Sequence, residues 1–166
     1  MKIPQMIILA LVLTPVIVFI LAQLGLFSGQ APSDLGISNE KLKAPSRTEN
    51  SVSSQARFFE NTDANVGYAK MPAYDYRGDA KSALSELKKV ISADFPEAQL
   101  VTESENYLRY EFKTKLMKFT DDVEFLLVDS EKSIHFRSAS RLGRRDLGKN
   151  RARMESIREK FSKAIK

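Results

Sequence analysis

An apolar segment near the amino terminus constrains the fold of this chain more than any other feature. Residues 3–27, IPQMIILALVLTPVIVFILAQLGLF, form a run of 25 residues without a charged side chain. As an α-helix the run would be about 37 Å long, enough to cross a hydrocarbon core of about 30 Å with some tilt. Pro15 would kink a transmembrane helix without forbidding it. Residues 1–27 are therefore predicted to form a transmembrane anchor.

A cleaved signal peptide is the alternative interpretation of this segment. The apolar core of a signal peptide is only about 7–15 residues long and is followed by a small-x-small cleavage site. Here the core is longer, and the best candidate site, Gly29-Gln30-Ala31, is followed by Pro32. The sequence therefore favours an uncleaved, single-pass anchor.

The charges that flank the anchor predict its orientation. Lys2 precedes the apolar run, whereas the first charges after it are Asp34 and then Lys41. Because basic residues near the ends of a membrane helix favour the cytoplasmic side, the amino terminus is expected in the cytoplasm. The rest of the chain would then be extracytoplasmic. In a Gram-negative bacterium this means the inner membrane and the periplasm.

Charge and composition exclude some functions for the remaining chain. The net charge is +5, and residues 132–166 hold twelve Lys and Arg against three acidic residues. A basic end favours anionic surfaces, although a solvated helix has the same composition. The chain has no cysteine, which excludes disulfides, thiol nucleophiles and cysteine-ligated metals.

Hydrophobic periodicity predicts an α+β domain over residues 50–166, joined to the anchor by a Ser- and Pro-rich linker, residues 28–49. Apolar residues at helical spacing predict helices within residues 77–96 and 149–164. Asp79 is the expected N-cap of the first helix and Asp146 of the second, and Pro96 prevents continuation of the first.

Between the two helices, apolar and polar residues alternate with a period of two. This pattern predicts strands over residues 107–114, 121–129 and 133–141, with residues 100–104 as a candidate fourth strand. The expected fold is a small antiparallel sheet of at least three strands, with both helices packed on one face.

The carboxy-terminal half resembles the domain of unknown function 1499 family, whose pattern includes F-x-D-D-x-E-F, R-S-x-S-R-x-G and D-L-G-x-N-R-x-R-x-E-x-I-R. The segments FTDDVEF at 119–125, RSASRLG at 137–143 and DLGKNRARMESIR at 146–158 carry this resemblance. NSVSSQA at 50–56 resembles an upstream element of the family. The resemblance covers residues 50–162 and implies no biochemical activity. Many members carry a cysteine where Ser51 stands, so a thiol cannot be required here.

Two interpretations of the arginine- and serine-rich motif remain open. Neighbouring antiparallel strands would set acidic residues beside arginines, as in a structural network of ion pairs. Alternatively, arginine forks, serine hydroxyls and the start of the last helix could bind an anion. The candidate residues under either interpretation are Asp122, Glu124, Arg137, Ser138, Ser140, Arg141, Asp146, Asn150 and Arg151.

The arginines are expected to differ in their surroundings. Arg137 and Arg141 should meet Asp122 or Glu124, and the start of the last helix should fasten the adjoining loop. Arginines outside this network should be solvated and free to face anionic headgroups or an acidic partner. These are Arg144, Arg145, Arg153 and Arg158.

Catalysis has little support in the sequence. His135, the single histidine, is expected to be solvated, and Asp121 and Asp122 should point to opposite faces of their strand. No metal-binding, cofactor-binding or phosphate-loop motif is present, and an extracytoplasmic domain would rarely meet nucleic acid. The sequence thus favours a binding or scaffolding module of the cell envelope, with anionic lipid or an envelope protein as candidate partner. An anion-binding domain or a hydrolase that uses the Arg-Ser motif is the alternative.

Overall fold

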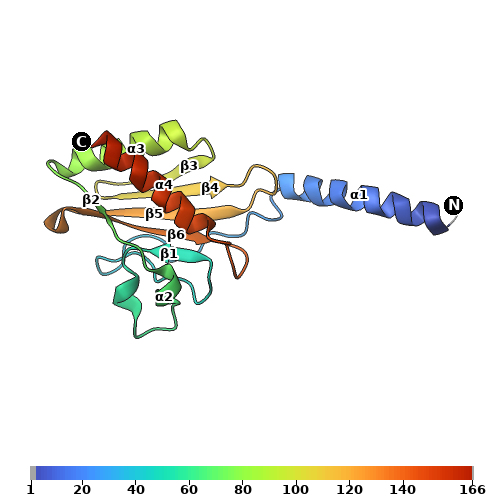
Figure 1. Cartoon of the computed structure of the whole chain (residues 1–166), viewed down its shortest axis with the longest axis horizontal. Helices are drawn as coiled ribbons and strands as arrows, with labels where there is room; N and C mark the ends of the chain where they lie inside the picture. The colour runs from blue at the N-terminus through green and yellow to red at the C-terminus, as the bar shows by residue number, and fades with distance from the viewer. Residues whose placement is uncertain (1–2, 166) are drawn as a thin grey trace.

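The computed structural model describes residues 3–165, so Lys2, whose charge predicts the orientation of the anchor, lies outside the described residues. The chain forms one long amino-terminal helix and an α+β domain, as predicted (Figure 1). Its elements in chain order, with η for a 3₁₀ helix, are α1 (Ile3–Gln23), β1 (Ser51–Ser53), η1 (Ala56–Phe59), α2 (Val66–Ala69), β2 (Tyr74–Asp75), α3 (Ala80–Asp94), β3 (Ala98–Glu103), β4 (Tyr107–Lys113), β5 (Thr120–Val128), η2 (Asp129–Glu131), β6 (Ser133–Ser140) and α4 (Lys149–Ala164).

Helix α1 is long and apolar enough to span a membrane. Its 21 residues continue through Pro15 and correspond to about 31 Å. The helix ends four residues before the apolar run does, because Gly25 adopts a left-handed conformation with φ 86°. The Leu26 amide then donates to the Leu21 carbonyl and the Gly25 amide to the Ala22 carbonyl, at 3.1 and 3.0 Å. This Schellman motif satisfies carbonyl groups at the helix end.

The sheet is antiparallel throughout and has the strand order β1-β6-β5-β4-β3, with β2 also paired to β6. The meander from β3 to β6 agrees with the predicted strands. Strands β1 and β2 were not predicted because they have three and two residues, too few to show alternation. Their extended conformation depends on pairing with β6, which is a tertiary contact.

One face of the sheet carries the hydrophobic core beneath α3 and α4 (Figure 1). The Asp79 carboxylate accepts a hydrogen bond from the Ser82 amide at 2.8 Å, so the predicted cap of α3 is confirmed. Helix α3 ends at Asp94, two residues before Pro96. The largest fully buried side chains of this core are Tyr74, Tyr110, Phe112, Phe125, Phe136 and Phe161.

The segment between α1 and β1 covers the second face of the sheet, although it has little regular structure. Leu42 is 2% exposed and packs against Tyr107 and Leu126. The Leu42 amide also donates to the side-chain oxygen of Gln55 at 2.9 Å. We therefore propose that the folded domain includes residues 34–46, upstream of the predicted boundary at residue 50.

Truncation of Leu42 tests whether this segment is part of the folded domain. Leu42→Ala should lower the free energy of unfolding by about 2–3 kcal/mol, because it leaves a cavity against β4 and β5. Ile37→Ala, in the same segment but exposed, should change it by less than about 1 kcal/mol. Denaturation of the purified full chain in detergent micelles measures both. An equally small effect of the two substitutions would show that the segment does not contribute to the domain.

Candidate functional site

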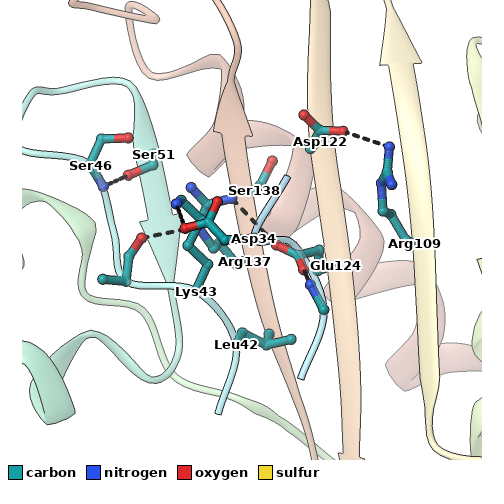
Figure 2. Close-up of polar contacts among 12 residues, drawn as sticks. Asp34, Leu42, Lys43, Ser46, Ser51, Arg109, Asp122, Glu124, Arg137 and Ser138 are labelled. Carbon is teal, nitrogen blue, oxygen red and sulfur yellow. Dashed lines mark hydrogen bonds and ion pairs between the residues drawn. The ribbon is translucent and has the colours of Figure 1, made fainter. Parts of the chain in front are cut away.

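The acidic and basic residues of the predicted motif meet on the second face of the sheet. Asp122 and Glu124 are two apart on β5, and Arg137 lies directly opposite Glu124 on β6. Arg141 follows the last residue of β6 and lies on the same face. The period-two alternation of strand side chains places these groups together. Figure 2 shows the segment that precedes β1 passing over this face beside Glu124 and Arg137.

Glu124 and Arg137 form a buried pair at the centre of the face. The Glu124 carboxylate has no solvent exposure, and it accepts hydrogen bonds from the Tyr107 hydroxyl and the Gly36 amide, both at 2.8 Å. Arg137 Nη1 donates to the same carboxylate at 3.4 Å, and its Nε donates to the Ala44 carbonyl at 3.2 Å. Burial lowers the pKa of the Arg137 guanidinium, and the Glu124 carboxylate opposes that shift.

Arg141 and Asp122 form a second, tighter pair. Nε and Nη2 of Arg141 donate to the two carboxylate oxygens of Asp122, each at 2.8 Å, and Nη2 also donates to Glu111. The hydrogen bond with Asp122 raises the pKa of Arg141 above its usual value. Arg109 Nη2 lies 3.5 Å from Asp122, whereas its buried Nε has no hydrogen-bond partner within residues 3–165.

The two serines of the motif lie on the opposite face, under the start of α4. The Ser138 hydroxyl donates to Asn150 Oδ1 at 2.6 Å, and Asn150 Nδ2 donates to the Ser140 hydroxyl at 3.1 Å. Asn150 is fully buried, and its Nδ2 also donates to the Asn50 carbonyl at 3.1 Å. The serines therefore hold α4 against β6 and the residue that precedes β1.

Asp146 fastens the loop between β6 and α4. Its carboxylate accepts hydrogen bonds from the Tyr68 hydroxyl at 2.6 Å and from the Asn150 and Gly148 amides at 2.8 and 3.0 Å. Burial opposes ionisation, but these hydrogen bonds outweigh it and lower the pKa of Asp146. The prediction that Asp146 is the N-cap of the last helix was wrong, because Gly148 occupies that position. Asp146 lies two residues upstream and still accepts a hydrogen bond from an amide of the first turn. Arg151 also reaches across this loop and donates to the Tyr68 carbonyl.

Two arginines that were expected to be solvated make specific contacts instead. Arg153 pairs with Asp121 on the core side of the sheet. Arg158 donates to the backbone carbonyls of Pro72 and Ala73 at 2.6 and 2.7 Å. The prediction was therefore wrong for both. It fits Arg144, which is exposed, and it fits the exposure of Arg145, although Arg145 Nε also pairs with Glu49 at 3.1 Å.

Helical spacing gives a signal that could have identified these two arginines. Arg153 lies three residues after Asn150, and Arg158 lies four residues after Met154. Residues at these spacings lie on the same side of a helix, and both Asn150 and Met154 are fully buried. The polarity of arginine hides the signal, because its aliphatic stem can cover apolar surface while its head reaches a partner.

For the residues considered for catalysis, the sequence predicted the strand face correctly but not the solvent exposure. Asp121 and Asp122 point to opposite faces, as predicted, the first toward Arg153 and the second toward Arg141. His135 is 4% exposed, so the expectation of a solvated side chain was wrong. Within residues 3–165, no group of three or more His, Asp or Glu side chains is placed to hold a metal ion.

The chain combines a helix that could cross a membrane with a domain whose antiparallel sheet carries a network of ion pairs. Its class is therefore an α+β domain that follows a candidate membrane helix. The family described as "Protein of unknown function (DUF1499)" matches residues 41–161, and the chain belongs to that family. The match begins within the segment that covers the second face of the sheet. A search of curated proteins found no match.

Substitution of an arginine in the ion-pair network should lower the free energy of unfolding far more than substitution of an exposed arginine. Arg141→Ala leaves the buried Asp122 carboxylate without its bidentate partner, and we expect a loss of about 3 kcal/mol in the free energy of unfolding. Arg144→Ala, three residues away and exposed, should change it by less than about 0.5 kcal/mol. Urea titration followed by circular dichroism measures both. Equal stability of the two variants would contradict a structural role for Arg141.

Proposed function

We propose that this chain is a single-pass protein of the inner membrane with its domain in the periplasm, and that the domain is a binding module that contacts the membrane surface. The observation that carries this proposal is a group of exposed apolar side chains around the point where the chain leaves α1. They lie in the β4–β5 loop and in the loop after β6, at the end of the domain from which α1 projects (Figure 1). The group consists of Leu116, Phe119, Leu142 and Leu147.

Contacts between α1 and these loops support this placement. Gln23 Nε2 donates to the Leu116 carbonyl at 2.8 Å, and the rings of Phe27 and Phe119 lie 5.6 Å apart. Gly29 has φ 63°, and a Cβ there would lie 2.9 Å from the Cβ of Arg141. Because the chain passes so closely between the two loops, a bilayer spanned by α1 would lie next to them.

Leu147 provides independent support for an apolar partner at this end. It is 89% exposed and has a positive φ of 54°, a conformation that is unfavourable for a residue with a side chain. Both the backbone conformation of this leucine and the exposure of its apolar side chain to water are energetically unfavourable. Insertion of its side chain into the interfacial region of a bilayer would offset part of that cost.

Basic residues in the same two loops match the charge of anionic lipid headgroups. Lys115 and Lys118 lie in the β4–β5 loop, and Arg144, Arg145 and Lys149 lie between β6 and the first turn of α4. Each basic side chain near an anionic surface contributes about 1 kcal/mol. Arg137 and Arg141 are less suited to a soluble anion, because protein acids and a backbone carbonyl already occupy their guanidinium groups.

A polarity-sensitive fluorophore can test this contact, because the chain contains no cysteine. Leu147→Cys, labelled and reconstituted as the full chain in vesicles with anionic lipid, should show an apolar environment. The matched control, Lys163→Cys near the end of α4, should report water. Arg144→Ala combined with Arg145→Ala, or high salt, should weaken the signal at position 147. Identical signals from positions 147 and 163 would contradict the proposal.

The orientation has its own test. A reporter enzyme that is active only in the periplasm, fused after Lys166, should be active in a Gram-negative host. The expectation follows from Lys2, which lies next to the apolar run, whereas the first charge after the run is the acidic Asp34. A reporter that functions only in the cytoplasm serves as the control in the same position. Activity of the control fusion alone would show the opposite orientation.

A further inference from the structure

A second feature, unrelated to the membrane contact, lies beside β6. A pocket of about 370 Å³ opens there, and a volume of this size accommodates small-molecule ligands. Three of its lining residues are Ser54, which directly follows β1, His135 of β6 and Glu131 of η2. Ser54 belongs to the NSVSSQA motif at 50–56.

These three side chains form a continuous chain of hydrogen bonds. Ser54 Oγ lies 3.1 Å from His135 Nδ1, and His135 Nε2 lies 3.0 Å from a carboxylate oxygen of Glu131. Imidazole with its proton on Nε2 satisfies both contacts, because Nε2–H then donates to Glu131 and Nδ1 accepts from the Ser54 hydroxyl. A hydroxyl, an imidazole and a carboxylate in this order are the components of an activated nucleophile.

The backbone of β6 directs the hydroxyl proton of Ser54 toward the imidazole. The Phe136 amide donates to Ser54 Oγ at 2.9 Å, so one lone pair of the oxygen is already occupied. The alternative acceptor for the hydroxyl proton, the Phe136 carbonyl, is farther away at 3.4 Å and already accepts the Ser54 amide at 3.0 Å. His135 Nδ1, at 3.1 Å, is therefore the better acceptor.

We propose that Ser54 is a nucleophile activated by His135, with Glu131 as the positioning residue, and that the site cleaves small esters that carry a negative charge. The preference for an anionic substrate follows from Arg57 and Lys70, which line the same pocket and are exposed. Both cations are placed to pair with a carboxylate or phosphate group of the substrate.

The reaction is an acyl transfer followed by hydrolysis. Ser54 Oγ forms a bond to the carbonyl carbon while its proton passes to His135 Nδ1, and the Glu131 carboxylate stabilises the imidazolium. The ester C–O bond then breaks, and the leaving alcohol takes the proton from Nδ1. A water molecule attacks the acyl-serine in the same manner, transfers a proton to Nδ1, and releases the acid and the free Ser54 hydroxyl.

A fluorophosphonate reagent, which reacts with activated serines, tests the nucleophile in the unmodified full chain in detergent. Trypsin releases residues 48–57 as one peptide, which contains Ser51, Ser53 and Ser54. The first two are fully buried and serve as internal controls. We expect the adduct on Ser54 alone. A folded protein without an adduct on Ser54 would overturn the proposal.

Variants of residues near Ser54 test whether its hydroxyl is activated or only exposed to the reagent. His135→Gln should slow labelling at least about 100-fold, whereas Ser130→Ala, at an exposed position of η2 outside this pocket, should leave the rate unchanged. Glu131→Gln should slow labelling, because the imidazole loses the carboxylate that accepts its Nε2 proton, and Glu131→Asp should restore part of the rate. Full labelling of a folded His135→Gln variant, or an unchanged labelling rate in a folded Glu131→Gln variant, would contradict these roles.

The substrate class has a separate test. The unmodified chain should hydrolyse an aryl ester bearing a carboxylate faster than an uncharged aryl ester, and Arg57→Ala combined with Lys70→Ala should remove that preference. Both substituted residues are exposed, so thermal unfolding should be unaffected. Equal rates for the two esters in the unmodified chain would overturn the assignment of an anionic substrate.

Discussion

The Glu124 carboxylate is fully buried in the middle of β5, and the architecture of the second sheet face depends on how its charge is accommodated. A buried charge is strongly destabilising unless it is paired and hydrogen-bonded. Three separate parts of the chain meet this requirement: the Tyr107 hydroxyl on β4, the Arg137 guanidinium on β6 and the Gly36 amide from the segment before β1. The position of that irregular segment is thus coupled to the folding of the sheet.

Arginines on the two sides of the sheet have the same physical role but different partners. On the second face, Arg137 and Arg141 pair with acids of β5, while on the core side Arg153 of α4 pairs with Asp121 of the same strand. The alternation of β5 thus distributes its acids to both faces, and each acid ties β5 to another element. The motif that resembled an anion site is largely saturated by contacts within the protein.

The remaining chemistry lies at the edges of this network. At one end of the domain, exposed apolar and basic side chains surround the exit of α1. Beside β6, Ser54 and His135 line a pocket, because the chain after β1 continues along β6 and Ser54 pairs with the Phe136 backbone. These peripheral residues carry the proposed membrane contact and the proposed nucleophile.

The sequence by itself determined the apolar helix, the meander, both long helices and the strand face on which each motif residue lies, because these follow from periodicity within a short stretch of chain. Only the tertiary structure decided what covers each face and which partner each side chain meets. Ser54 and His135 are separated by 81 positions, and Gly36 and Glu124 by 88. Such contacts depend on strand register and on the path of an irregular segment. Neither leaves a local pattern, so the sequence predicted a solvated His135 and a solvated Arg153, whereas the fold gives each side chain specific polar partners.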